Sequence, residues 1–310
     1  MISIIIATHN RADSLKLLLE ALSEQQSCPA FEVIVADNNS SDHTRKVVDA
    51  GSKKFSGRLK YHFEARPGKC QILNQAIKLA QGSIFVFTDD DVQLEPHWLS
   101  WLIKCFETYK CDGVGGRVLP IFNADTPAWV RKNAVKLSGG VVIHDHGEND
   151  CRFEESMYPF LGANYAFRRE VFDDIGGFDE TLGPGVGTVG EDSEFVLRAL
   201  RAGKVLYYCG RALIWHPVDP ERLGWKYVSE WNIALGRYAA RKEMAESNGM
   251  VLIGGVPRYL IRGIAVDAVR LGISVFSKFA FYDARRSYFR KLGMILEYRE
   301  NSKLRKKRST

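Results

Sequence analysis

The stretch Ile84-Phe85-Val86-Phe87-Thr88-Asp89-Asp90-Asp91 is the most informative part of this chain. Its first four residues form a short apolar run rich in β-branched and aromatic side chains, which is typical of a buried strand in a parallel sheet. Three adjacent carboxylates then repel one another, and placing them beside a core is costly unless a cation or hydrogen bonds compensate. Ligands of open α/β sheets bind at the carboxyl ends of strands, so the stretch predicts a divalent metal that holds a phosphorylated ligand.

Apolar runs and helical patterns alternate on both sides of this stretch. Asp13 and Asp42 can each cap a helix that follows a strand, and Gly82 can end another. Such a βαβ series predicts an α/β fold, with a mostly parallel central sheet flanked by helices. The expected strands span residues 3–7, 31–36, 60–63, 84–87 and 114–119, and the expected helices include residues 68–80 and one that Pro96 opens.

The later part of the chain is less regular. Residues 120–155 have no clear period, and from Arg222 onward the chain becomes helical and basic. We expect a domain over residues 1–220, with halves 1–119 and 120–220, and a helical extension over residues 221–310. Within the half 120–220, the pattern predicts a strand over 160–167, a helix over 168–175, a glycine-rich loop over 183–190 and a helix over 191–202. Two further strands are expected over 205–208 and 212–215, and the second ends at His216.

Polar side chains follow the first, second and fourth expected strands. Parallel strands end at one edge of a sheet, so these side chains should share a rim that suits a nucleotide diphosphate. Lys69 and Arg66 precede the next helix and can meet phosphate oxygens from the side. Simpler interpretations stay open, because the acidic triplet can be a solvated turn and Asp37 can form an Asx-turn. The expected rim residues are Thr8, Asn10, Asp37, Asn39, Asp89, Asp90 and Asp91.

Several separate blocks, in this order, resemble the family 2 glycosyltransferases, which have the GT-A fold. The resemblance runs from Ser3 to about His216, and one departure is Ala36, where many members have a second aspartate. The blocks are residues 3–10, Val35-Ala36-Asp37-Asn38-Asn39-Ser40-Ser41-Asp42, Gly68-Lys69 with Leu73-Asn74 and Ala76, Phe87-Thr88-Asp89-Asp90-Asp91, Gly176-Gly177-Phe178-Asp179-Glu180, and Glu191-Asp192 with Arg198 and Gly203.

The resemblance implies a role for each matching residue. Asp37 would contact the base of the nucleotide, and Thr8, Asn10, Asn39 and Lys69 would complete the nucleotide site. Asp89 and Asp91 would be the acids of the DxD motif; Asp91 would bind Mn²⁺ or Mg²⁺ directly, and Asp89 and Asp90 would serve the ribose and the outer shell of the metal. His216 would be a further metal ligand, although a histidine before a proline is often structural.

Residues Asp192 and Glu191 would supply the general base, with Asp192 preferred. Acids in the first turn of a helix are also favoured by the helix dipole alone. The implied reaction is a metal-assisted single displacement with inversion at the sugar C1. It uses a nucleotide-sugar donor, expected to be UDP-linked, and a glycan or lipid-linked acceptor, as in polysaccharide biosynthesis.

Two rival functions remain at this point. A sugar-phosphate nucleotidyltransferase on a similar fold needs a glycine-rich loop after the first strand, and residues 8–13 contain no glycine. A non-catalytic membrane-binding protein would not need Asp91 and Asp192. Residues 185–190 match the dinucleotide pattern GxGxxG, but they do not follow the first strand of a βαβ unit, so a mobile flap over the donor sugar is the better interpretation.

The positive charge of the chain is concentrated in its last third. Of the 43 Lys and Arg residues, 19 lie in residues 221–310, with only 8 of the 37 acidic residues. Residues 267–281 predict an amphipathic helix with Asp267 and Lys278 on one side and Val269 and Phe276 on the other. This pattern favours an anionic membrane surface as the partner, rather than nucleic acid, and a helical cap packed on the domain is the alternative. The apolar N-terminus without a basic leader favours a cytoplasmic location, at the cytoplasmic face of the membrane.

Overall fold

The computed structural model of the chain describes residues 1–137, 139–246 and 252–308. Internal contacts divide the chain into two compact units, which we call the sheet unit and the helical unit. The sheet unit comprises Met1–Ile121, Val142–Val186 and Glu191–Pro217. The helical unit comprises Phe122–Val141, Gly187–Gly190 and Val218–Thr310, so two segments from the middle of the chain group with the C-terminal helices.

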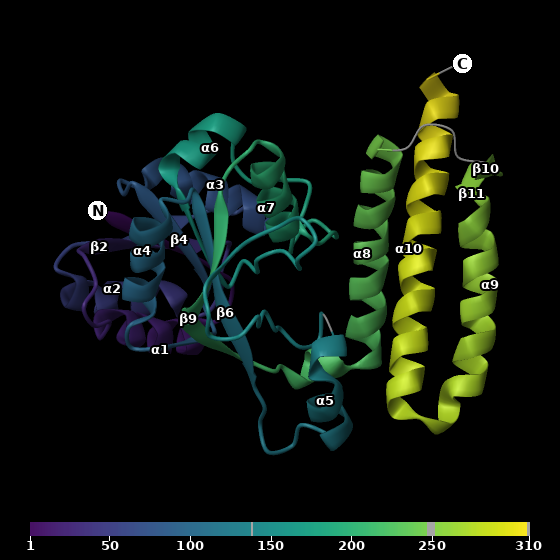
Figure 1. Cartoon of the computed structure of the whole chain (residues 1–310), viewed down its shortest axis with the longest axis horizontal. Helices are drawn as coiled ribbons and strands as arrows, with labels where there is room; N and C mark the ends of the chain where they lie inside the picture. Colours follow the sequence, from purple (N-terminus) through teal and green to yellow (C-terminus); the bar gives the residue numbers. More distant parts are fainter. Residues whose placement is uncertain (138, 247–251, 309–310) are drawn as a thin grey trace. The chain divides into compact units, whose positions relative to one another are not determined.

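The predicted α/β fold is confirmed in the sheet unit (Figure 1). The strands lie in the order β3-β2-β1-β4-β8-β6-β9-β5, and β7 pairs with β9. Strands β1, β2, β3 and β4 run parallel, whereas β8 is antiparallel to both β4 and β6. The strands are β1 (Ile2–Thr8), β2 (Phe31–Asp37), β3 (Leu59–Phe63), β4 (Ile84–Asp89), β5 (Gln93–Leu94), β6 (Gly113–Ile121), β7 (Cys151–Arg152), β8 (Asn164–Arg168) and β9 (Leu206–Pro217).

Helices cover both faces of this sheet because successive strand residues point to opposite faces. In β1, Ile4 and Ile6 pack in one core cluster with the leucines of α1, whereas Ile5 packs in a second cluster with α3. One face carries α1 (Ala12–Ser23), α2 (Thr44–Gly51) with η1 (Ser52–Phe55), and α4 (Trp98–Tyr109). The other carries α3 (Lys69–Leu79), α6 (Arg169–Ile175) and α7 (Glu191–Arg201).

Two predicted strand boundaries are wrong. The strand expected from residue 160 begins only at Asn164. The strands expected over 205–208 and 212–215 are one strand, β9, which pairs with β6 along its length. A register shift between Gly116 and Arg117 lets the pairing continue past residues 210–212, where the sequence suggested an interruption.

The helical unit is built around three long helices, and α10 lies between α8 and α9 (Figure 1). Glycine allows α8 and α10 to touch, because a Cβ at Gly236 would lie 2.0 Å from the Arg290 carbonyl oxygen. Within the described residues, no helix is both long and apolar enough to cross a membrane. The elements are α5 (Ala128–Asn133), η2 (Ala134–Lys136), η3 (Pro220–Leu223), α8 (Trp225–Glu246), β10 (Leu252–Ile253), β11 (Val256–Pro257), α9 (Arg258–Ile273), η4 (Ser274–Phe276) and α10 (Lys278–Arg308).

The amphipathic helix predicted over residues 267–281 is also wrong. Helix α9 ends at Ile273, Ser277 has an extended backbone, and α10 starts at Lys278. Asp267, which the pattern placed on the polar side of that helix, is buried. It accepts hydrogen bonds from Ser287 at 2.7 Å and Lys291 at 2.5 Å, both on α10, so tertiary pairing decides which side of α9 faces inward.

Candidate active site

The sheet brings the ends of three predicted strands together. In the strand register, Thr8 at the end of β1 is opposite Asp37 at the end of β2, and Ala7 is opposite Asp89 at the end of β4. The polar residues that follow these strands therefore lie along one edge, as the parallel pattern predicted.

Asp89, Asp91 and His216 form a cluster on this edge. One ligand atom from each lies within 4.8 Å of the others. His216 Nε2 is 3.6 Å from Asp91 Oδ1 and 3.8 Å from Asp89 Oδ2. The histidine reaches the triplet because β5, just after Asp91, pairs with β9 and places Gln93 opposite Trp215.

The donor atoms of this cluster fit a divalent cation. Asp91 Oδ1 is buried and accepts no hydrogen bond from the described residues, which is costly for a carboxylate oxygen unless a cation compensates. His216 Nδ1 lies 2.9 Å from the Pro217 carbonyl oxygen, which can only accept, so Nδ1 carries a proton and Nε2 is the ring nitrogen that faces the carboxylates and would bind a cation. Carboxylate oxygens with one imidazole suit Mn²⁺ and are compatible with Mg²⁺.

The middle residue of the triplet, Asp90, points away from this cluster. Its side chain is buried and accepts hydrogen bonds from the Thr8 hydroxyl at 2.7 Å and from Arg11 at 3.1 Å. Burial raises the pKa of Asp90 to about 6, against the opposing effects of Thr8 and Arg11. Two predicted nucleotide-site residues, Thr8 and Asp90, are thus bonded to each other beneath the edge.

Arg11 is a site residue that the sequence interpretation missed. It lies 2.6 Å from Asp91 Oδ2 as well as 3.1 Å from Asp90 Oδ1, and its side chain is 37% exposed. A guanidinium beside the acidic triplet can balance carboxylate charge or meet a phosphate. The sequence did contain one indication of this role, because Arg11 comes just after the first strand and therefore on the same edge as the triplet.

Asp37 is buried at the end of β2 and is held by two donors. Its Oδ1 accepts from the Ser40 N–H at 2.8 Å, and its Oδ2 accepts from the Tyr61 hydroxyl at 2.7 Å. The second donor, Tyr61 on β3, was not predicted as a site residue. Each carboxylate oxygen retains a further acceptor position, so Asp37 keeps the capacity to meet a nucleotide base.

Asn10 and Asn39 shape the loops after β1 and β2. Both have a positive φ, 52° and 65°, which asparagine tolerates better than most residues. Asn10 Oδ1 accepts from the Ser41 N–H at 2.7 Å, so the first loop is bonded to the second. Asn10 and Asn39 therefore both lie in the loops that form this edge.

Lys69 connects the metal-site candidates to the predicted bases. Its Nζ is 2.9 Å from Asp89 Oδ1. Burial would lower the pKa of Lys69, but Asp89 and Glu191 outweigh burial and raise the pKa, so the amine stays charged. Conversely, burial would raise the pKa of Asp89, but Lys69 and then His216 hold the pKa below its ordinary value. Arg66, by contrast, pairs with Glu64 at 2.7 Å.

Glu191 and Asp192 open helix α7 near Lys69. A Cβ added to Gly162 would lie 3.7 Å from both Asp192 Cβ and Lys69 Nζ, so both side chains border Gly162. Asp192 accepts from the Gly162 N–H at 3.1 Å and from the Ser193 N–H at 2.7 Å. Burial and the neighbouring Asp192 raise the pKa of Glu191 to about 7, so Glu191 can exchange a proton near neutral pH.

The glycine-rich loop borders the same region. Gly183 and Gly185 have φ values of +95° and +92°, which side-chain-bearing residues rarely adopt. The Pro184 carbonyl accepts from the Lys69 N–H at 3.0 Å, and a Cβ on Gly185 would lie 2.8 Å from the Gly68 nitrogen. The loop follows α6 rather than β1, which supports the rejection of a dinucleotide-binding motif.

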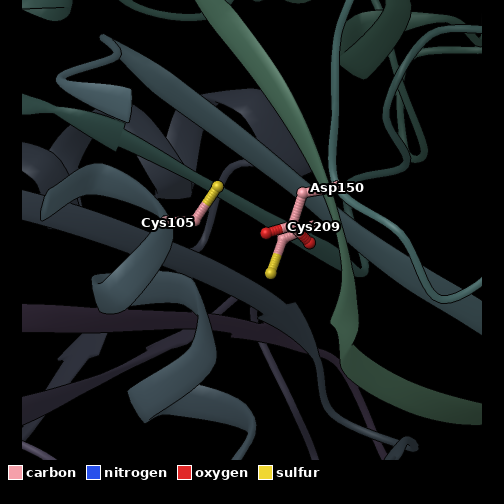
Figure 2. Close-up of side chains that lie close together, drawn as sticks. All are labelled: Cys105, Asp150 and Cys209. Atoms are coloured by element: carbon pink, nitrogen blue, oxygen red, sulfur yellow. The ribbon is translucent and has the colours of Figure 1, made fainter. Parts of the chain in front are cut away.

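A second group of possible ligands, Cys105, Asp150 and Cys209, has a different chemistry (Figure 2). Cys105 on α4 and Cys209 on β9 belong to the hydrophobic core. Neighbouring thiols and burial raise the pKa of Cys105 far above its ordinary value, which favours the neutral thiol over a metal-binding thiolate. Asp150 accepts from the Gly210 N–H at 3.1 Å, so the edge cluster is the stronger metal candidate.

The sheet of this chain has the GT-A type of fold. The chain belongs to glycosyl transferase family 2, which it matches over residues 3–176, more than half of its length. It is 26% identical over 185 residues to a glucosyl-dolichyl phosphate glucuronosyltransferase of Haloferax volcanii, covering 59% of this chain and 57% of that protein. It is 24% identical over 270 residues to the glycosyltransferase AglE of the same organism, covering 83% and 82%.

Solved structures share the fold at low sequence identity. The mannosyltransferase PcManGT of Pyrobaculum calidifontis, in complex with GDP-Man and Mn²⁺, matches with a TM-score of 0.61 and 17% identity, over 96% of this chain and 86% of that one. Residues 1–349 of S. aureus TarS, in complex with UDP-GlcNAc, match with a TM-score of 0.55 and 17% identity, over 98% and 91%. At this identity the likeness shows the fold alone.

Proposed function

We propose that the protein transfers a sugar from a nucleotide-sugar donor, UDP-linked, to an acceptor hydroxyl, with inversion at C1. The observation that carries this proposal is that Lys69 pairs with Asp89 of the metal-site cluster and, like Asp192, borders Gly162. Glycosyl transfer needs both a stabilised leaving group and a nearby base, and this arrangement supports both.

Asp89, Asp91 and His216 would hold Mn²⁺ or Mg²⁺. When bound, such a cation offsets the negative charge that develops on the departing diphosphate. Arg11 and Lys69 would add fixed positive charge beside the same phosphates, since both already contact the triplet. Asp90 would act from beneath the edge by fixing Arg11 and Thr8.

Asp37 would contact the base of the nucleotide, held in position by Tyr61 and Ser40. Asn10 and Asn39 would shape the surrounding loops, and Asp89 would serve the ribose as well as the metal. The uracil imide is a donor that a carboxylate such as Asp37 can accept from, which supports a UDP-linked donor.

Asp192 would take the proton of the acceptor hydroxyl, and Glu191 would tune or share that role. Two backbone N–H groups orient the Asp192 carboxylate, and its α7 neighbour Glu191 titrates near neutral pH. A single base on the far side of the sugar from the leaving group gives one displacement and therefore inversion. The glycine-rich loop would close over the donor sugar.

The acceptor would be a growing glycan or a lipid-linked sugar. One relative is named as acting on a glucosyl-dolichyl phosphate, and another, from Trichormus variabilis, is a beta-monoglucosyldiacylglycerol synthase that is 27% identical over 183 residues. The basic C-terminal helices would place the enzyme at an anionic membrane surface, on the cytoplasmic side. No nucleic-acid partner is expected.

The test is release of UDP from a panel of UDP-sugars in the presence of Mn²⁺ or Mg²⁺. We expect metal-dependent release that Asp91→Asn and Asp192→Asn both reduce strongly, while Asp192→Asn still binds UDP. A nucleotidyltransferase would instead consume a nucleoside triphosphate and release pyrophosphate, and a non-catalytic binding protein would do neither. Either of those outcomes would overturn the proposal.

A further inference from the structure

Helix α9 packs on α10 by one side only. Leu260 and Asp267 on that side are buried, and Asp267 is bonded to Ser287 and Lys291 of α10. In the three-helix arrangement α10 lies between α9 and α8, so α8 does not cover the opposite side of α9 (Figure 1).

The uncovered side of α9 and the turn η4 is apolar. Val266 and Val269 are each 66% exposed, Ile273 is 72% exposed and Phe276 is 98% exposed. Single exposed apolar residues are ordinary, but a row along one helix marks an interaction surface. We name this surface the α9 face, and it consists of Val266, Val269, Ile273, Val275 and Phe276.

The exposed charged residues of α9 itself are all basic. Arg258, Arg262 and Arg270 are exposed on α9, and Arg270 pairs with Asp283 at 2.7 Å. The only carboxylate of α9 is Asp267, which is buried on the other side. A surface with an apolar centre and basic edges complements an anionic lipid layer, whose interior is apolar and whose headgroups are negative.

The same charges disfavour pairing with a second copy. Symmetric packing of two α9 faces would bring Arg258 and Arg262 of both copies near one interface, with no exposed carboxylate on α9 to compensate them. The helix has 16 residues, about 24 Å at about 1.5 Å per residue, and no described helix is fit to span a bilayer. These observations fit a helix that lies in the membrane surface.

We propose that the α9 face binds the surface of an anionic lipid bilayer, with its apolar side chains among the acyl chains and Arg258 and Arg262 at the phosphate groups. The inference rests on the membrane location in the proposed function and specifies the contact. The sequence pattern placed Asp267 on the side opposite Val269 and Phe276, and in the structure Asp267 is buried whereas Val269 and Phe276 are exposed.

The experiment measures binding of the full chain to vesicles by flotation. Phosphatidylcholine vesicles are compared with vesicles that also contain phosphatidylglycerol. We expect binding that depends on phosphatidylglycerol and weakens with added salt. The variant Ile273→Ser/Phe276→Ser should bind at least about tenfold more weakly, since each change removes apolar area from the contact. Arg258→Gln/Arg262→Gln should lose mainly the additional vesicle binding that phosphatidylglycerol provides.

The matched control is Leu17→Ser/Leu79→Ser, which removes two exposed apolar residues outside the α9 face. It should bind vesicles as the wild type does. Unchanged vesicle binding by Ile273→Ser/Phe276→Ser would overturn the inference. It would also be overturned if light scattering showed that the wild type is a dimer and that this variant is a monomer. UDP release should be unchanged in all the α9 variants, and Asp91→Asn should bind vesicles normally, so failure here is distinguishable from failure of the proposed reaction.

Discussion

The ammonium group of Lys69 lies 2.9 Å from Asp89 Oδ1 and borders Gly162, as the side chain of Asp192 also does. One positive charge therefore compensates carboxylates from two separate segments of the chain. The acidic edge of the sheet depends on this compensation, because several partly buried negative charges otherwise repel one another.

Replacing Lys69 with methionine should destabilise the protein at neutral pH. We expect a loss of about 2 kcal/mol in the free energy of unfolding, below the roughly 3–5 kcal/mol of a fully buried pair, since the side chains of Lys69 and Asp89 are 23% and 27% exposed. The pKa of Asp89 is held below its ordinary value, so its ionised form stabilises the fold above that value and the contribution fades as pH falls. Urea unfolding should therefore show a similar difference at pH 5 and pH 8 and a smaller one only well below pH 3.8, the ordinary pKa of the Asp89 carboxyl. Lys69→Arg should be milder.

Asp91→Asn should weaken metal binding and turnover together. The change removes charge from the buried Oδ1 that has no other partner in the described structure. We expect turnover to fall by more than about 100-fold. Mn²⁺ affinity, measured by electron paramagnetic resonance, should fall as well. Glu107→Gln, an exposed carboxylate on α4, is the control that should change neither; full Mn²⁺ affinity in Asp91→Asn would refute the metal site.

Glu191→Gln should stabilise the protein at alkaline pH only. The pKa of Glu191 is raised from 4.5 to about 7, so the folded state holds this proton more tightly than the unfolded state. Its stabilising effect is complete below about pH 4.5 and is lost as pH rises through 7. The variant should gain roughly 1–3 kcal/mol over the wild type at pH 8 and much less at pH 5, by urea unfolding in EDTA.

The control for this change is Glu170→Gln, an exposed acid in the first turn of α6. It should show no such pH-dependent gain. An equal effect of Glu191→Gln at both pH values would mean that Glu191 titrates normally.

Tyr61→Phe should weaken UDP binding. The Tyr61 hydroxyl orients Asp37 through a 2.7 Å hydrogen bond, and losing a bond to a charged group costs about 1 kcal/mol or more. Calorimetry should show a dissociation constant about fivefold higher, and a larger loss for Asp37→Asn. Tyr109→Phe, whose hydroxyl is 3.4 Å from Asp150, should leave UDP binding unchanged. Normal UDP binding by Asp37→Asn would exclude the proposed base contact.

Gly185→Ala should be more damaging than Gly187→Ala. Both glycines have a positive φ, +92° and +73°, but only at Gly185 would a Cβ collide, at 2.8 Å from the Gly68 nitrogen. Gly187→Ala should cost about 1 kcal/mol for the backbone conformation alone. Gly185→Ala should cost clearly more in urea unfolding, and equal costs would show that the loop relaxes freely.

The edge of the sheet could be predicted because strand ends are local features. Thr8, Asp37 and Asp89 each follow an apolar run, and parallel pairing then places them together. The family resemblance supplied His216, but only tertiary structure explains its position, through the pairing of β9 with β5. Tyr61 was missed because its partner Asp37 lies on another strand, beyond the reach of a local pattern. Arg11 was missed although it follows the first strand, because its partners Asp90 and Asp91 come after a different strand, β4.

The C-terminal helices show why a hydrophobic pattern can mislead. An amphipathic pattern assumes that charged residues face water, yet Asp267 is buried because Lys291 offers it a partner on α10. Nothing between Ile273 and Lys278 is a strong helix breaker, so the end of α9 could not be seen from local preferences.

The three carboxylates of the acidic triplet point in two directions. Asp89 and Asp91 lie with His216, whereas Asp90 points inward to Thr8 and Arg11. Deleting one residue of β4 just before the triplet would move Asp89 to the strand position that Thr88 now holds, whose side chain is buried. The spacing of this turn is therefore as strict a requirement as the identity of its carboxylates, and evolutionary insertions should fall elsewhere along the rim.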